Sequence, residues 1–228
     1  MTVAPSPGEV DTPARGGRIR RQHEVAILAA AEQVFARAGF QGATMAEIAL
    51  AAGLPKSNLH YYFGTKAEVY RAVLANILRL WLAETDRINA DADPREALAH
   101  YIEAKMRLTA EHPDASRVFA NELLHGAPEI GDYLCNELRL LVADKAAVIE
   151  AWIAAGKMAP VDPVHLFISL WALTQTYADF ETQVCAVLNR PSLESADYRR
   201  ATAHVLNLVL RGCGLAPPIL EGSFPCST

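Results

Sequence analysis

Apolar residues recur along this chain at the spacing of an amphipathic α-helix and rarely alternate in the manner of a strand. The first such stripe begins near Gln22 and ends at Gly39, a residue that typically stops a helix in a left-handed conformation. Its apolar face consists of Ile27, Leu28, Ala31, Val34, Phe35 and Ala38. Because Val, Ile and Thr seldom alternate with polar residues, the pattern predicts an all-α fold.

Breakers divide the rest of the chain into further helical segments, for example at His112-Pro113 and Asn189-Arg190-Pro191. We expect about nine helices, over residues 22–38, 44–52, 55–62, 65–89, 94–111, 114–125, 128–155, 162–188 and 194–212. Residues 1–21 are expected to form a flexible basic arm. Residues 213–228, which are rich in Gly, Pro and Ser, are expected to form a flexible tail.

Residues 44–63 have the pattern of a helix-turn-helix. Thr44-Met45-Ala46-Glu47 is a capping box, in which the Thr hydroxyl and the Glu carboxylate satisfy free amides of the first turn. Gly53 permits the tight turn that follows, and Pro55 stands where a helix tolerates a missing N–H. The second helix of this motif is expected to bury Leu59, Tyr62 and Phe63.

The same helix leaves a polar face outward, made of Lys56, Ser57, Asn58, His60 and Tyr61. Lysine meets phosphate or guanine, asparagine and serine read base edges, and tyrosine meets phosphate or a thymine methyl group. The face therefore predicts binding to double-stranded DNA. Taken alone, a motif this short also fits a plain helical hairpin.

Charge is distributed unevenly along the chain. The net charge of −5 is not typical of a nucleic-acid binder. However, the first 71 residues carry 8 basic and 6 acidic residues, whereas the remaining 157 carry 13 basic and 20 acidic ones. A mildly basic head on an acidic body suits a protein whose head alone approaches phosphates.

Nothing in the sequence has the spacing of a catalytic or metal site. The cysteines, Cys135, Cys185, Cys213 and Cys226, are far apart, and we expect reduced structural thiols. The histidines show no triad or metal-ligand spacing, and there is no Gly-rich phosphate loop. No apolar run reaches the roughly 18 residues of a membrane span, and the first 20 residues lack the apolar core of a signal peptide. We expect a cytoplasmic protein without enzymatic activity, cofactor or membrane contact.

A longer pattern surrounds the helix-turn-helix, from Phe35 to Tyr70. This stretch resembles the TetR family of transcriptional regulators, whose pattern G-F…T…I-A-x-A-G…Y-x-x-F-x-x-K it matches at nearly every position. The resemblance implies a DNA-binding domain over residues 22–82. In that family Thr44 would cap a helix whose first turn meets a phosphate. Lys56, Ser57, Asn58 and His60 would face the major groove, Tyr61 would touch the backbone or a base, and Lys66 would contact phosphate.

The arginines that precede this domain leave two interpretations open. Arg18, Arg20 and Arg21 would either grip the adjacent DNA backbone or minor groove, or remain solvated.

The C-terminal part has a resemblance of its own, over residues 77–83, 112–128, 156–163 and 171–180. These pieces are similar to the branch of the TetR family that controls pyrimidine catabolism and responds to uracil and thymine. The resemblance implies a sensing and dimerisation domain over residues 83–212. Pro55, Ser57 and His60 depart from that branch, which indicates a different operator.

Trp171, Gln175 and Asp179 lie four residues apart and so share one helix face. A glutamine amide offers both a donor and an acceptor, as the alternating N–H and C=O edge of uracil requires. Trp81 could cover the flat face of the ring, and Tyr101 and Lys105, one helical turn apart, could complete a ligand pocket. The first three residues also fit a helix face at the dimer interface, or a glutamine buried against backbone. Tyr101 and Lys105 also fit an exposed amphipathic face.

A homodimer would place two recognition helices about one DNA turn apart (~34–36 Å), so that they read a pseudo-palindrome. The apolar faces of the last two long helices could form a four-helix interface from Leu166, Leu170, Leu173, Tyr177, Phe180, Val205, Leu208 and Val209. The hypothesis is a repressor that a small ligand, a pyrimidine, releases from DNA. The alternatives are a TetR-type regulator of another small metabolite and, from other classes, a helical protein-interaction module or an enzyme.

Overall fold

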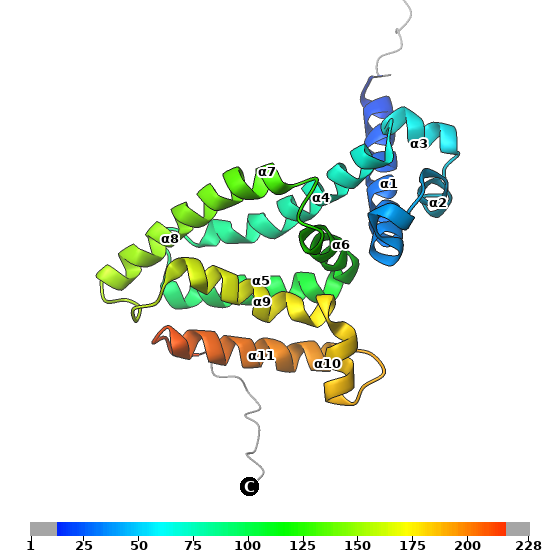
Figure 1. Cartoon of the computed structure of the whole chain (residues 1–228). Coiled ribbons are helices and arrows are strands. Elements are labelled where there is room, and N and C mark those ends of the chain that lie inside the picture. Colours follow the sequence, from blue (N-terminus) through cyan, green and yellow to red (C-terminus); the bar gives the residue numbers. More distant parts are fainter. Residues whose placement is uncertain (1–12, 218–228) are drawn as a thin grey trace, which may run out of the picture. The chain divides into compact units, whose positions relative to one another are not determined.

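The computed structural model describes residues 13–217, with side chains from residue 20 onward (Figure 1). Over this range the predicted all-α fold is confirmed, without a strand. The segments are α1 (Pro13–Gly42), α2 (Met45–Ala51), α3 (Lys56–Tyr62), α4 (Lys66–Leu82), the 3₁₀ helix η1 (Ala83–Arg87), α5 (Pro94–Glu111), α6 (Pro113–Leu124), α7 (Gly131–Tyr133), the π-helical η2 (Leu134–Leu138), α8 (Arg139–Ala154), α9 (Pro163–Asp179), α10 (Glu181–Leu188) and α11 (Ser195–Gly212). Within the same range, no helix combines the length and the apolar character needed to cross a membrane.

One helix more is present than the sequence pattern predicts. α7, η2 and α8 run on as one helix, so the described residues hold ten helices when the short 3₁₀ helix η1 is not counted. The additional helix arises because the predicted helix over residues 162–188 is divided at Phe180 into α9 and α10. On α6, the Ser116 hydroxyl donates to Asp179 just before this break. Arg117, also on α6, pairs with Glu181 just after it. This double attachment to α6 accompanies a break where the sequence has neither Gly nor Pro.

The chain forms two compact units that meet between Val73 and Leu74, inside α4. The sequence places this boundary later, after residue 82. The difference arises because the two halves of α4 pack in different units. Tyr70 lies against an aromatic ring of α1, whereas Trp81 lies against an aromatic ring of α6. We refer to these parts as the N-terminal and the C-terminal unit.

The N-terminal unit packs α1, α2, α3 and the first half of α4 around a small core. The stripe predicted on α1 is buried at Ile27, Ala31, Val34 and Phe35. The regular part of α1 ends where the pattern predicts, because Gly39 has φ 66° and ψ 174°. The predicted capping box is present as well. The amide of Glu47 donates to the Thr44 hydroxyl over 3.2 Å, and the amide of Thr44 donates to the Glu47 carboxylate over 2.9 Å.

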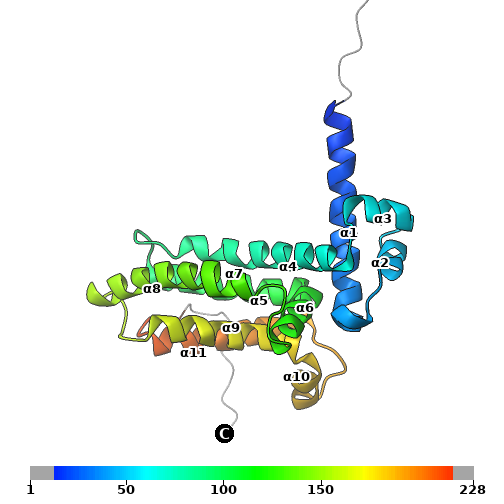
Figure 2. The same ribbon diagram turned by 45° about the horizontal axis from the view of Figure 1, so that its top comes forward.

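α5 runs through the middle of the C-terminal unit. Figures 1 and 2 show α9 and α11 beside α5, while α6 and α8 pack against α9. One continuous core joins α5, α9 and α11, and its members include Leu98, Tyr101, Ile102, Phe167, Leu170, Val205 and Leu206. The shared burial of these apolar faces is what holds the three helices together.

Helix α1 begins earlier than the sequence pattern predicts. It starts at Pro13, so residues 13–21 are helical and are not part of a flexible arm. Residues 1–12, the rest of the predicted arm, lie outside the described residues. The pattern misses this start because the apolar stripe that it follows begins only at the buried part of the helix.

The chain after α11 is also more firmly held than predicted. Cys213 is buried, and its carbonyl accepts a hydrogen bond from the amide of Ala159 over 2.9 Å. Leu215 packs against the core. The predicted tail therefore does not begin at residue 213, because these residues bury apolar surface and satisfy backbone groups. Residues 218–228 lie outside the described residues.

Gly156 follows α8 with a φ of 69°, a conformation that residues with a Cβ rarely adopt. Gly156→Ala is expected to cost about 1–2 kcal/mol from backbone strain alone, because nothing lies within 4 Å of the added Cβ. Gly131→Ala is the matched control, since this glycine is helical and equally open. It should leave stability unchanged or raise it by about 0.4–1 kcal/mol. Urea denaturation measures both variants, and equal free energies of unfolding would contradict the assigned strain.

Candidate nucleic-acid interface and ligand cavity

α3 presents the predicted recognition residues on the outside of the N-terminal unit. The exposed residues are Lys56, Ser57, Asn58, His60 and Tyr61. Leu59 is fully buried and anchors the helix, whereas Tyr61 exposes 73% of its surface. All five residues are therefore accessible on the surface of α3. Their contacts with DNA remain a prediction.

The orientation of the His60 ring is set by the residue that follows its helix. The Nδ1 atom of His60 lies 3.3 Å from the carbonyl oxygen of Gly64. Because a carbonyl only accepts, Nδ1 carries the proton in this contact, and Nε2 of the neutral ring is left as an acceptor. An acceptor on this exposed side chain suits the amino group of cytosine or adenine.

Lys66 has partners inside the N-terminal unit that the sequence does not predict. Its ammonium group donates to the carbonyl oxygens of Phe40 over 2.6 Å and of Ala43 over 2.9 Å. It also lies 4.6 Å from the centroid of the Phe40 ring. The end of a helix leaves carbonyls without intrahelical partners, and Lys66 satisfies two of them next to Gly39. These contacts give Lys66 a structural role inside the unit, and its predicted contact with phosphate stays a prediction.

The arginines near the start of α1 keep their two interpretations. Nε of Arg20 lies 3.1 Å from the Glu24 carboxylate, and both side chains are exposed. An exposed ion pair contributes little to stability, so Arg20 can exchange this partner for a phosphate. Arg21 is exposed, whereas the side chain of Arg18 lies outside the described residues.

A cavity of about 380 Å³ lies in the C-terminal unit among α4, α5, α6, η2 and α9. Its volume falls within the roughly 300–1,000 Å³ of small-molecule sites. It is lined by Leu78, Trp81, Leu82, Tyr101, Lys105, Phe119, Leu123, Leu134, Leu138, Ile168, Trp171 and Gln175. The predicted residues Trp81, Tyr101, Lys105, Trp171 and Gln175 are thus brought together. Sequence reasoning missed the apolar lining, although Leu134 and Leu138 lie one helical turn apart on a predicted helix.

Tyr101 and Trp171 form a fixed polar pair in the wall of this cavity. The indole N–H of Trp171 donates to the Tyr101 hydroxyl over 2.9 Å. Burial raises the pKa of Tyr101 to about 12, although the hydrogen bond from Trp171 opposes this. The hydroxyl therefore keeps its proton at neutral pH and can donate it to a ligand.

Lys105 is a buried cation in the same wall. Its side chain is 3% exposed, and its ammonium nitrogen lies 4.2 Å from the centroid of the Trp81 ring. No described residue makes a hydrogen bond or ion pair with it. Burial lowers the pKa of Lys105 from 10.5 to about 7, and the charge of Asp179 offsets only part of this effect. The amide of the partly buried Gln175 is likewise without a hydrogen-bond partner among the described residues.

Asp179 is separated from the residues with which the sequence groups it. It does not line the cavity, and its carboxylate accepts a hydrogen bond from the Ser116 hydroxyl. Burial raises the pKa of Asp179, while Ser116 and Lys105 oppose the shift. We correct the predicted ligand contact of Asp179 to a role in which it tunes the charge of Lys105 and ties α9 to α6.

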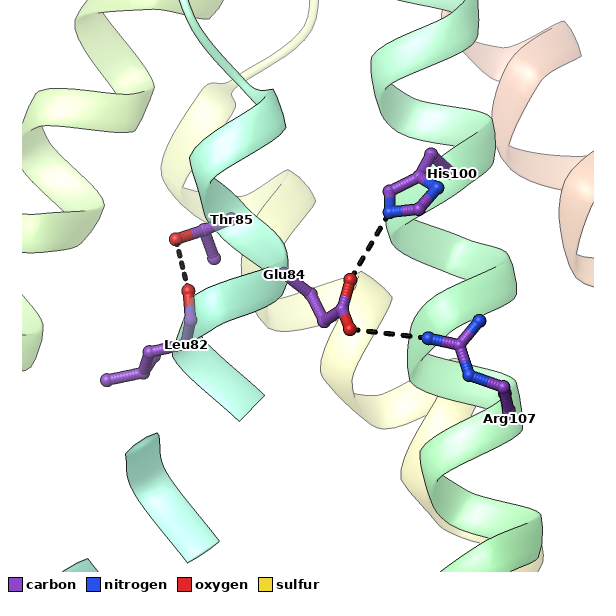
Figure 3. Close-up of polar contacts among 5 residues, drawn as sticks. All are labelled: Leu82, Glu84, Thr85, His100 and Arg107. Carbon is purple, nitrogen blue, oxygen red and sulfur yellow. Dashed lines mark hydrogen bonds and ion pairs between the residues drawn. The ribbon is translucent and has the colours of Figure 1, made fainter. Parts of the chain in front are cut away.

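The end of α4 is held in place beside the cavity by a cluster of polar side chains. Figure 3 shows the Glu84 carboxylate between His100 and Arg107, both on α5. One Glu84 oxygen lies 3.2 Å from Nε2 of His100, and the other lies 3.3 Å from the Arg107 guanidinium. The Thr85 hydroxyl donates to the carbonyl of Leu82 over 2.7 Å. These contacts fix η1 on α5 directly after the cavity residues of α4.

Two family models match consecutive parts of the chain. Residues 27–73 match the bacterial regulatory proteins of the tetR family, and residues 74–216 match the C-terminal region of YcdC-like proteins. The two matches meet where the compact units meet.

Individual relatives agree with these matches. The chain is 38% identical to the HTH-type transcriptional regulator RutR of Escherichia coli K12 over 205 residues, which cover 90% of this chain and 97% of RutR. A tetR-family regulatory protein of Rhodococcus RHA1 has a similar structure, with a TM-score of 0.68, 24% identity, and coverage of 85% of this chain and 98% of that one. PfmR of Thermus thermophilus gives a TM-score of 0.64 at 20% identity, covering 81% of this chain and 94% of that one. These two structural similarities establish the fold alone.

Matched variants can compare the exposed Lys56 with Lys66, which binds carbonyls inside the N-terminal unit. Lys56→Met should reduce DNA affinity and its salt dependence, while stability stays unchanged, because Lys56 is exposed. Lys66→Met should destabilise the N-terminal unit by about 1–3 kcal/mol, because two carbonyls lose their charged donor. Urea denaturation and DNA titration at several salt concentrations separate the two effects. A Lys66→Met protein of unchanged stability would argue against the structural role.

Lys105 should make stability depend on pH between about 7 and 10.5, its folded and ordinary pKa values. In that window the unfolded chain holds a proton that the folded chain has lost, so the free energy of unfolding rises with pH. Below pH 7 both states are protonated, and this slope vanishes. Relative to Lys105→Met, the wild-type unfolding constant should therefore fall by up to about tenfold per pH unit from pH 7 to 9.

Urea denaturation of both proteins at each pH measures this difference. Lys157→Met, at an exposed position, is the control and should follow the wild-type pH dependence. Parallel stability curves for the wild type and Lys105→Met would show that Lys105 keeps an ordinary pKa.

Proposed function

The chain belongs to the TetR family of helix-turn-helix transcriptional regulators, a non-enzymatic class, and we propose that it is a repressor released from DNA by a pyrimidine such as uracil or thymine. The observation that carries the proposal is the cavity of the C-terminal unit. It combines aromatic faces with the polar groups of the buried Lys105 and the partly buried Gln175, which have no hydrogen-bond partner among the described residues. A cytoplasmic location follows from the same proposal, because the operator is there.

The DNA half of the proposal rests on the exposed face of α3. Lys56 would meet phosphate or guanine, while Ser57, Asn58 and His60 read base edges in the major groove and Tyr61 touches the backbone. The first turn of α2, which Thr44 caps, would meet a phosphate. A single face of this size contacts few base pairs, so affinity requires two copies on a pseudo-palindromic operator.

A homodimer would supply the second copy through α10 and α11. Leu170, Val205 and Val209 are buried within one chain, so they are removed from the dimer face that the sequence suggests. Apolar side chains remain exposed at Phe180, Val187, Leu188 and Leu208. A self-complementary interface of these residues would bury apolar surface that is otherwise left in water.

The effector half rests on complementarity to a flat heterocycle with alternating donors and acceptors. Gln175 offers both an N–H donor and a carbonyl acceptor, and the Tyr101 hydroxyl offers a proton. The rings of Trp81 and Phe119 meet edge to face, with centroids 5.0 Å apart, and provide an aromatic surface for the ring. Lys105 would donate to a ligand carbonyl and so satisfy the buried ammonium.

Release from DNA follows if the ligand binds one arrangement of the dimer more tightly than the other. The shift is limited to the difference between these two affinities. A regulator that responds to another small metabolite is the second candidate, because most of the cavity wall is apolar. A protein-interaction module or an enzyme would show no salt-dependent affinity for DNA.

The test is binding of the purified protein to DNA upstream of its own and neighbouring genes, at fixed salt, with and without uracil or thymine. Binding that falls with salt and is abolished by the pyrimidine supports both halves. If binding falls with salt but does not change with uracil or thymine, the protein is still a DNA-binding regulator, and the pyrimidine is rejected as its ligand. Absence of binding calls for operator selection from random sequences.

Gln175→Met should raise the uracil concentration needed for release by about tenfold or more, because a ligand hydrogen bond in a buried site is lost. Its affinity for DNA in the absence of uracil should not change. Gln33→Met, on the outer side of α1, is the control and should respond to uracil as the wild type does. Titration of the DNA complex with uracil measures the shift, and an unaltered midpoint would remove Gln175 from the site.

A further inference from the structure

A second hollow of about 310 Å³ adjoins the cavity between α8 and α9. Its lining consists of Leu134, Leu138, Arg139, Val142, Ala143, Val164, Ile168 and Trp171. Arg139 is the one charged residue of this lining, and its Nε donates to the carbonyl of Cys135 over 3.0 Å. The second hollow is therefore an aliphatic surface with one aromatic residue.

The cavity and the second hollow share part of their walls. Leu134, Leu138, Ile168 and Trp171 line both. Leu134 and Leu138 are the two ends of η2, the π-helical segment. A π-helical turn inside an α-helix is rare and frequently marks a functional site. The dividing wall is thus a departure from regular helix geometry, placed between two apolar spaces.

The second hollow leaves large apolar side chains in contact with water. Val164 is 45% exposed and Ile168 is 50% exposed. Covering them would be favourable by the usual free energy of apolar burial. Because the hollow and the cavity share a wall, a molecule seated in the cavity lies next to these side chains.

The polar groups belong to the cavity alone. Lys105 and Gln175 line the cavity and do not line the second hollow. A single pyrimidine ring displaces on the order of 100 Å³, a few waters at ~30 Å³ each, whereas the cavity holds about 380 Å³. The ring alone would satisfy the polar groups and leave most of the apolar wall uncovered.

We propose that the effector is an amphiphile, with a hydrogen-bonding head at Lys105 and Gln175 and an aliphatic chain that passes η2 into the second hollow. The proposal rests on the proposed function, since it names the ligand class of the same site. The head of this ligand is still a pyrimidine, and its aliphatic chain covers the apolar wall that the ring leaves uncovered. Leu134 and Leu138 then set the width of the passage, and Val142 and Val164 receive the end of the chain.

The test is a series of 5-alkyluracils from methyl to hexyl, titrated by tryptophan fluorescence or calorimetry. Each methylene buried in the hollow should tighten binding by about fourfold, until the chain reaches the end of the space. A parallel series of alkanoates, from butanoate to decanoate, carries the same chain on a carboxylate head that suits Lys105.

Val164→Glu tests the location of the chain, because Val164 lines the second hollow and not the cavity. This variant should abolish the gain with chain length and leave the affinity for uracil within about twofold. His165→Glu, at the next position of α9 and exposed, is the matched control and should keep the gain.

The outcomes separate the two proposals. If alkanoates gain affinity with chain length and uracil does not bind, the pyrimidine head is wrong and the amphiphile stands. If uracil binds and neither series depends on chain length, the pyrimidine stands and the amphiphile is overturned. If a dependence on chain length survives in Val164→Glu, the chain does not enter the second hollow and the proposal fails.

Discussion

The cavity of the C-terminal unit is arranged around an ammonium group that is largely removed from water. Moving a cation from water into an apolar interior is costly unless an anion or hydrogen-bond acceptors receive it. Lys105 meets the ring of Trp81 and the field of Asp179, but no acceptor of the described chain bonds to it. The burial of this ammonium group without an acceptor accounts for the lowered pKa of Lys105. It also gives the cavity a polar end that a ligand can satisfy.

The residues around Lys105 do not supply a hydrogen-bond acceptor for its ammonium group. Asp179 is the nearby carboxylate, but the Ser116 hydroxyl binds it. The Tyr101 hydroxyl accepts from the indole of Trp171 and makes no hydrogen bond with Lys105. Glu84, with His100 and Arg107, holds η1 beside the cavity and keeps its own charges outside the lining (Figure 3). The polar side chains around the cavity are thus committed to one another, while Lys105 and Gln175 remain for a ligand.

The sequence predicts some residue environments correctly and misses others. In α3 the assignment of Leu59 to the core and of Lys56, Asn58 and Tyr61 to the surface was correct, because neighbouring helical positions face in different directions. The carbonyl partners of Lys66 were not predicted, because they lie at the end of α1, far away in the sequence. The same limit applies at Phe180, where contacts from α6 accompany a break that no local residue signals.

The sequence by itself determined the all-α fold, the capping box at Thr44, the turn at Gly53 and the polar face of α3. Each of these depends on residues within a few positions of one another. Only the tertiary structure decided that Tyr101 and Lys105 of α5 face Trp171 and Gln175 of α9 across one cavity, and that Asp179 does not. That choice depends on how helices from distant segments pack, and a local periodicity carries no information about which neighbour will bury a given face.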